Sequence, residues 1–225
     1  MPFCLHEKIM YFYPPTKYSM LIKIYPENPN TRHIQQVVEC IRDGGVIVYP
    51  TDSMYAFGCD LFQIRAVERV AQLKGLQLEK ANFSIVCTDL SNISDYTRPF
   101  SNQIYKTMKK ALPGPFTFIL NASSQVPRIF QSKKKTIGIR VPENPIPRLI
   151  VQELGNPIIS TSVFSLSDDV EYLTDPELLY EEFMDRVDLV IDSGIGDIQV
   201  STVVDCTGDE MMVVRQGKGD FEPYL

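Results

Sequence analysis

Short apolar runs of strand type alternate along this chain with segments whose apolar residues recur at helical spacing. The clearest pair is a helix expected over residues 32–43, with Thr31 as its N-cap, and a strand over residues 46–49. Because strands and helices interleave, the pattern predicts an α/β protein of the α+β type, with a twisted mixed sheet flanked by helices. Further strands are expected over residues 20–25, 83–87, 116–120, 136–141, 157–162 and 187–191, a hairpin over 202–206 and 211–215, and helices over 66–73, 102–112, 146–154 and from Asp175 onward.

The first residues of the chain do not share this pattern. Residues 1–19 combine aromatic side chains with Pro14-Pro15 and show no regular period, whereas Met20 opens a strand-like run. We interpret residues 1–19 as an N-terminal extension, either disordered or lying upstream of a native start at Met20. Residues 20–225 are expected to form a single domain.

The charge balance limits the classes of partner. The chain has 225 residues and a formal net charge of −6, which argues against broad, non-specific binding to nucleic acid. A basic groove on an otherwise acidic body stays open as an alternative. No apolar stretch is long enough to cross a membrane, and the N-terminus has no signal-peptide pattern. We therefore expect a soluble, cytoplasmic protein.

Few residues are suited to metal binding or to histidine-based catalysis. The only histidines are His6 and His33, and none of the five cysteines has zinc-finger spacing. We expect reduced cysteines that pack as small apolar side chains, and no metal held by protein ligands. The sequence also has neither a Walker A motif nor a GxGxxG motif, so nucleotide binding would need another route.

Hydroxyl and guanidinium side chains collect where predicted strands begin or end. In open α/β sheets ligands bind at strand ends, and these groups suit phosphate and carboxylate. Such a site would orient reactants and stabilise charge, but it would not supply a strong base. The residues concerned are Thr51, Ser53, Arg140, Ser160, Thr161, Ser162, Ser201, Thr202 and Arg215.

Five short segments occur in a fixed order, and together they resemble a known family. They are GVIVYPTDSMY at 45–55, PGPFT at 113–117, IGIRVP at 137–142, STVVD at 201–205 and VRQG at 214–217. In this order they are similar to the motifs of the YrdC/YciO superfamily, which contains the threonylcarbamoyl-adenylate synthases. The resemblance covers nearly everything from about Tyr25 to the C-terminus.

The resemblance implies a YrdC-like fold with a large, concave, positively charged cavity. It also implies an enzyme that condenses threonine, bicarbonate and ATP into threonylcarbamoyl-adenylate and pyrophosphate, for threonylcarbamoyladenosine modification of tRNA. ATP would then be a substrate accompanied by Mg²⁺, and tRNA or double-stranded RNA a partner.

The same resemblance assigns roles to individual residues. Thr51, Lys74 and Arg140 would be catalytic, with Arg140 pairing with the substrate carboxylate and Lys74 facing phosphate. Thr51 and Tyr55 would line the threonine or carbamate pocket. Ser201 and Thr202 would shape the floor of that pocket, and the nucleotide would contact Lys74, Thr117, Ser160, Ser162 and Arg215.

Two departures concern the ATP side. Synthases of the family carry Lys-x-Arg and Ser-x-Asn pairs, whereas this chain has Leu76 and Phe164 in place of the arginine and the asparagine. The pattern resembles the YciO-type branch of the family. Arg69 or Lys80 is a candidate to replace the missing charge.

Three functions therefore stay open at this point. The first is a threonylcarbamoyl-AMP synthase-like enzyme, weakened or altered in substrate. The second is a YciO-type protein that binds double-stranded RNA, tRNA or the ribosome without synthase activity. The third is a hydrolase or transferase that acts on another carbamoylated nucleotide.

Overall fold

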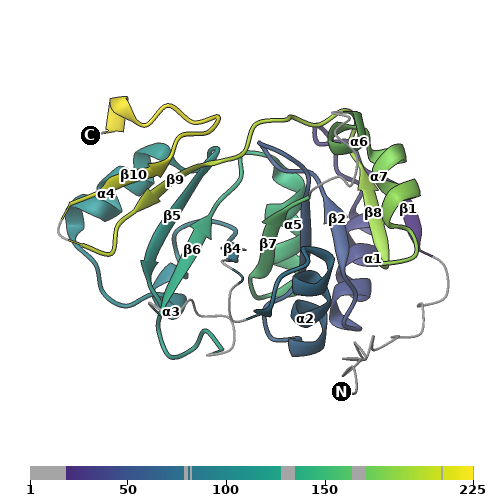
Figure 1. Ribbon diagram of the computed structural model, residues 1–225, viewed down its shortest axis with the longest axis horizontal. Coiled ribbons are helices and arrows are strands. Elements are labelled where there is room, and N and C mark those ends of the chain that lie inside the picture. The colour runs from purple at the N-terminus through teal and green to yellow at the C-terminus, as the bar shows by residue number, and fades with distance from the viewer. Residues whose placement is uncertain are drawn as a thin grey trace, which may run out of the picture.

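The strands of the chain assemble into one twisted, ten-stranded sheet that runs from β1 at one end of the molecule to β10 at the other (Figure 1). The structure is a computed structural model that describes residues 19–78, 81, 83–127, 135–163, 171–208 and 210–224. The strands are β1 (Met20–Lys23), β2 (Ile47–Tyr49), β3 (Ala56–Asp60), β4 (Ser84–Val86), β5 (Phe116–Asn121), β6 (Thr136–Arg140), β7 (Ile158–Ser162), β8 (Leu189–Asp192), β9 (Thr202–Asp205) and β10 (Met212–Arg215).

The sheet is mixed, as the sequence predicts. Its order is β1-β8-β2-β3-β7-β4-β6-β5-β9-β10. β8 runs parallel to both β1 and β2, and the pairs β4–β6 and β5–β9 are also parallel. The remaining neighbours are antiparallel, including the predicted hairpin of β9 and β10.

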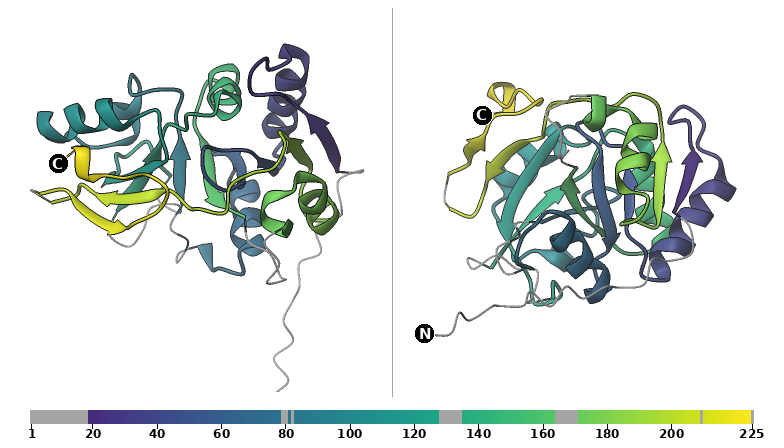
Figure 2. Two further views of the ribbon diagram at one scale, coloured as in Figure 1. Left: turned by 90° about the horizontal axis from the view of Figure 1, so that it is seen from above. Right: turned by 45° about the vertical axis from the view of Figure 1, so that its right-hand side comes forward.

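Helices cover both faces of the sheet (Figure 2, left). α1 (Thr31–Arg42) and α5 (Pro145–Leu154) pack together on one face, and α2 (Ile64–Leu73) and α7 (Pro176–Phe183) lie on the opposite face. In the described part of the chain no helix has the length and apolar character needed to span a membrane. The shorter elements are α3 (Ile93–Tyr96), α4 (Asn102–Ala111), α6 (Glu171–Thr174) and the 3₁₀ helix η3 (Glu222–Tyr224).

β2 is apolar throughout because it is buried on both faces. Successive side chains of a strand point to opposite sides, so Ile47 and Tyr49 join the core under α1 and α5, while Val48 joins the core under α2 and α7. β8 divides its residues in the same way. A short continuous apolar run is what such a strand requires.

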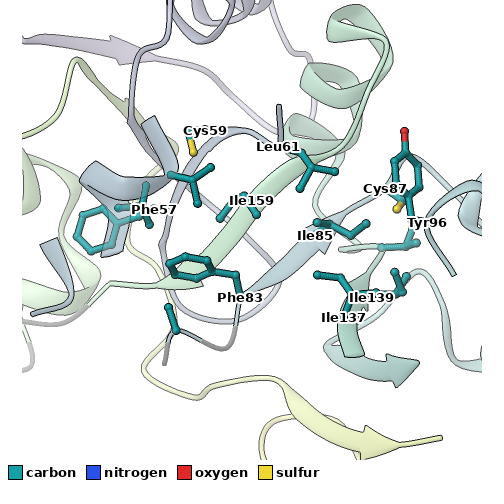
Figure 3. Packing of buried hydrophobic residues seen from close by; sticks show 14 of the residues in the cluster. Phe57, Cys59, Leu61, Phe83, Ile85, Cys87, Tyr96, Ile137, Ile139 and Ile159 are labelled. Atoms are coloured by element: carbon teal, nitrogen blue, oxygen red, sulfur yellow. The ribbon is translucent and has the colours of Figure 1, made fainter. Parts of the chain in front are cut away.

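The larger core is built from aromatic and branched side chains of neighbouring strands, among them β3, β7, β4 and β6 (Figure 3). Phe57 of β3 meets Phe183 of α7 edge to face, with the ring centroids 5.0 Å apart. Cys59, Cys87 and Cys206 lie in the same core and are free thiols, and burial raises the pKa of Cys87 to about 12. This confirms the predicted packing role of these cysteines.

Most predicted helix ends are confirmed by their capping contacts. Gly155 ends α5 in the left-handed conformation, with φ of 87°. Ser101 caps α4 and accepts a hydrogen bond from the backbone of Ile104, and Asp175 caps α7 ahead of Pro176. The predicted cap of α1 is wrong, because Asn30 accepts from the backbone of Arg32 and Thr31 is already helical.

The sequence analysis missed β3, α3 and α6. β3 holds Gly58, a residue that weakens a strand prediction, but here a Cβ at Gly58 would lie 2.6 Å from the ring of Tyr49. The glycine is thus required by the close approach of a buried aromatic side chain from β2. The predictions about residues 1–18, Lys80 and Phe164 concern positions outside the described residues.

Replacing Phe183 with alanine tests the larger core. Phe183→Ala removes a fully buried ring that packs on Phe57, and we expect it to lower the free energy of unfolding by about 3–5 kcal/mol. The neighbouring Met184 is 44% exposed, so Met184→Ala should change it by less than about 0.5 kcal/mol. Urea denaturation of the two variants measures both values, and equal losses would contradict this account of the core.

Candidate active site

The loop after β2 is shaped by the hydroxyl of its own first polar residue. Thr51 Oγ1 donates to the carbonyl of Met54 at 2.7 Å and accepts from the backbone N–H of Ser53 at 3.0 Å. This local turn needs a hydroxyl or carboxamide side chain at its start. It turns Asp52 and Ser53 toward the end of β6, where Arg140 lies.

Arg140 and Asp52 form a buried ion pair. Arg140 Nη2 lies 2.9 Å from Asp52 Oδ1 and donates to Ser53 Oγ at 3.0 Å, and each side chain of the pair is only 6% exposed. The second oxygen of Asp52 accepts from the backbone N–H of Glu143 at 2.8 Å. Both oxygens of the Asp52 carboxylate therefore accept a hydrogen bond, and the carboxylate holds the guanidinium group in place.

One nitrogen of Arg140, Nε, is buried without satisfying its hydrogen-bonding capacity, because it has no hydrogen-bond partner among the described residues. A buried donor without a partner costs free energy, typically about 1–3 kcal/mol. Arg140 can therefore gain from an acceptor such as a carboxylate oxygen, which is the role that the sequence analysis assigned to it.

The sheet surface beside Arg140 is lined by small polar residues. Ser84 pairs with Gly138 of β6 on one side and with Ser160 of β7 on the other. A Cβ at Gly138 would lie 3.0 Å from both Ser84 Cβ and Thr117 Cγ2. Glycine at this position avoids crowding the side chains of the two neighbouring strands.

A hydroxyl pair and an arginine follow at the β5–β9 side. Thr117 Oγ1 and Ser201 Oγ lie 2.8 Å apart, and Arg215 donates to the carbonyl of Ser201 through Nε at 3.2 Å and Nη2 at 2.8 Å. Burial and the positive charge of Arg140 lower the pKa of Arg215. Two guanidinium groups therefore act on one another here, and an anion between them would relieve the repulsion.

The remaining nucleotide-side residues lie around β7. Tyr49 donates from its hydroxyl to Ser160 Oγ at 2.7 Å, and Lys74 Nζ donates to the carbonyl of Ser162 at 2.8 Å. Burial lowers the pKa of Lys74. β7 thus connects the residue predicted to face phosphate with the strip of hydroxyl groups on the sheet.

Two of the predicted pocket residues are used in the framework. Tyr55 is 1% exposed and donates to the carbonyl of Gly194 at 2.8 Å. Thr202 is fully buried and donates to the carbonyl of Gly219 at 2.6 Å. Each side chain therefore holds a loop in place, at Gly194 for Tyr55 and at Gly219 for Thr202.

Of the two positions that depart from the family pattern, Leu76 and Phe164, the structure describes only Leu76. Leu76 follows α2 and is 43% exposed. Arg69 does not replace the missing charge, because it pairs with Asp188 at 2.8 Å, next to the backbone N–H of Val46 at the start of β2. The suggestion that Arg69 stands in for the arginine is therefore wrong.

A cleft of about 350 Å³ opens beside the Arg140–Asp52 pair. The sequence analysis gave no role to three residues around it, namely Asp52, Glu143 and Lys218. Asp52 lies in the same motif as Thr51, which was a usable signal. Glu143 and Lys218 lie just after the IGIRVP and VRQG motifs and outside them, so only the folded structure shows that they line the cleft. The cleft is lined by Pro26, Thr51, Asp52, Pro115, Glu143, Asn144, Pro145 and Lys218.

Comparisons with known proteins place the chain among relatives of similar sequence and fold. A family model described as Sua5_yciO_yrdC, Telomere recombination, matches residues 39–217. The protein named Uncharacterized protein YciO from Escherichia coli K12 is 42% identical over 208 residues, which cover 92% of this chain and 100% of that protein. The crystal structure of E. coli YciO, with the same coverage, matches with a TM-score of 0.85.

Synthases and Sua5 match at lower identity. The threonylcarbamoyl-AMP synthase of Coxiella burnetii, strain RSA 493, is 30% identical over 166 residues, which cover 74% of this chain and 88% of that protein. The structure of P. abyssi Sua5 complexed with L-threonine is 24% identical, with a TM-score of 0.80, and the match covers 88% of this chain and 58% of that one. That likeness shows a shared fold. Together the matches confirm the resemblance drawn from the five motifs.

Removing the carboxylate of Asp52 tests the buried ion pair. Asp52→Asn leaves the Arg140 charge buried without its counterion, and we expect the free energy of unfolding to fall by about 3–5 kcal/mol. Asp43→Asn, at an exposed position after α1, makes the same chemical change and should alter it by less than about 0.5 kcal/mol. Chemical denaturation at neutral pH compares the two, and a loss below about 1 kcal/mol for Asp52→Asn would contradict the importance given to the pair.

Proposed function

This chain belongs to the Sua5/YciO/YrdC family, and we propose that it is a threonylcarbamoyl-AMP synthase-like protein. In this proposal it condenses threonine, bicarbonate and ATP into threonylcarbamoyl-adenylate and pyrophosphate, for the threonylcarbamoyladenosine modification of tRNA. Support comes from the relative named threonylcarbamoyl-AMP synthase at 30% identity and from a Sua5 structure of similar fold that contains L-threonine.

The observation that carries the proposal is the arrangement of Arg140. Its guanidinium is held by Asp52 and Ser53, and its buried Nε has no described partner. A threonine carboxylate that accepts from this group would be oriented at the mouth of the Thr51 loop. Asp52 holds the guanidinium in place before substrate arrives, so little reorganisation is needed on binding.

The phosphate end of the site would be served by hydroxyls and cations. Forming the bond between the carbamate and the α-phosphate releases pyrophosphate and leaves negative charge on the phosphate oxygens. Lys74 and Arg215 can stabilise that charge, and Thr117, Ser160 and Ser162 can donate hydrogen bonds to the nucleotide.

Mg²⁺ would reach this site together with the nucleotide. The carboxylate of Asp52 is already used by Arg140 and Glu143, and among the described residues no group of three or more His, Cys, Asp or Glu is placed to hold a metal ion. That donor set fits an ion bound mainly through phosphate and water, which is common for Mg²⁺. Bound in this way, Mg²⁺ would supply neutralisation of the phosphate charge.

One observation favours a second function. Leu76, where the synthases of the family carry an arginine, places an apolar and partly exposed side chain near the phosphate side. A site that keeps the amino-acid end and loses this cation fits a YciO-type protein that binds tRNA, double-stranded RNA or the ribosome without synthase activity. The two functions make opposite predictions in one assay.

Incorporation of labelled bicarbonate into an adenylate, with threonine, ATP and Mg²⁺, tests the synthase activity. We expect product from the wild-type protein and at least a 100-fold loss with Arg140→Ala, because the carboxylate then has no fixed partner. Arg98→Ala removes an exposed arginine and should keep the wild-type rate. Absence of product, together with tight and salt-sensitive binding of tRNA, would refute the synthase and favour the binding protein.

Restoring the family pair tests the account of the phosphate side. Losing a fixed cation opposite developing phosphate charge costs roughly two to three decades of rate. We therefore expect the double substitution Leu76→Arg with Phe164→Asn to raise the rate of adenylate formation by about 10- to 100-fold. The same assay measures it, with Leu21→Arg as a control at an exposed position of β1. A double variant no faster than wild type would contradict the explanation.

A further inference from the structure

The turn at residues 216–219 is fixed in place by contacts that leave little freedom. The buried hydroxyl of Thr202 accepts from the backbone N–H of Gly217 at 2.9 Å and donates to the carbonyl of Gly219. The backbone N–H of Lys218 donates to the carbonyl of Val200 at 2.9 Å. A Cβ at Gly217 would collide with that same carbonyl, so the turn requires glycine there.

This turn presents the side chain of Lys218 to two other segments. Its Nζ donates to the backbone carbonyl of Asp52 at 2.8 Å and lies 2.8 Å from Asp197 Oδ2. The hydrogen bond from Lys218 lowers the pKa of Asp197, with a further contribution from the backbone N–H of Gln199. Lys218 therefore joins the C-terminal turn, the β8–β9 connection and the Thr51 loop.

The contact with Asp52 matters because of what Asp52 does. Its side chain holds Arg140 and the backbone N–H of Glu143, while its backbone carbonyl is held by Lys218. Lys218 also lines the cleft next to Thr51. A shift of the Asp52 backbone would thus move the group that orients the guanidinium.

We propose that Lys218 is a positioning residue that holds the Thr51–Ser53 loop in the geometry in which Thr51 and Arg140 receive the amino-acid substrate. The ligand in this inference rests on the proposed function, whereas the effect on the loop does not. Lys218 is 39% exposed and Asp197 30%, so the ion pair itself adds little to global stability. Its effect is local and falls on the amino-acid end of the site.

Lys218→Met tests the inference, because it keeps much of the aliphatic side chain and removes the three donors of the ammonium. We expect amide hydrogen exchange to accelerate at least about fivefold at Ser53 and Glu143, whose N–H groups bond to Thr51 and Asp52. Threonine affinity should fall about tenfold, while ATP affinity and the thermal midpoint stay unchanged. Lys218→Arg should restore threonine affinity to within about threefold of wild type.

The control is Lys109→Met, on the exposed side of α4, which should change neither exchange nor binding. Exchange at Ser53 and Glu143 that is equal in the two methionine variants would overturn the inference. So would equal losses of threonine and ATP affinity, since these indicate a general effect on the fold. If the wild-type protein binds no threonine, the proposed function fails, and the exchange rates alone still decide the role of Lys218.

Discussion

The candidate site depends on the ion pair between Arg140 and Asp52. Burying two charges is costly, and the pair offsets that cost only because Ser53 and the backbone of Glu143 complete its hydrogen bonds. It joins the loop after β2 to the end of β6. In the sheet, β3, β7 and β4 lie between these two strands. The position of the pair, more than its contribution to stability, explains why charged residues occupy a buried place where apolar ones would pack at lower cost.

The two ends proposed for the site, one for the amino acid and one for phosphate, are built in different ways. At the amino-acid end, contacts that run from one residue to the next link Thr51, Ser53, Arg140, Asp52 and Lys218. At the phosphate end, Lys74 contacts the β7 backbone and Thr117 contacts Ser201, and Arg215 reaches the same serine. The first group links three separate segments of the chain, whereas in the second group Lys74 contacts β7 and the linked residues Thr117, Ser201 and Arg215 lie at the β5–β9 side.

Much of the fold could be predicted from the sequence because its signals are local. The stripe of α1, the glycine after α5 and the cap of α7 each lie within a few residues of the element they define. β3 was missed because the reason for Gly58 is the ring of Tyr49 on another strand. Thr51 and Arg140 could likewise be named separately, but the carboxylate that joins them is 88 positions from Arg140, and Lys218 is 166 positions from Asp52. Contacts at such separations leave no periodicity in the sequence.

The difference between the two ends explains how a protein of this family can keep its fold and still differ in chemistry. Leu76 lies after the end of α2 with 43% of its surface exposed, so an arginine or a leucine is accommodated there without repacking the core. Substitution at Asp52 or Arg140, in contrast, would leave a buried charge without its partner. Stability therefore depends on Asp52 and Arg140, whereas the side chain at position 76 can change its charge without disturbing the core. Family membership follows from motifs at both ends, whereas the proposed synthase reaction also needs positive charge at the phosphate end, which is why the bicarbonate assay tests a different property from the one that the motifs identify.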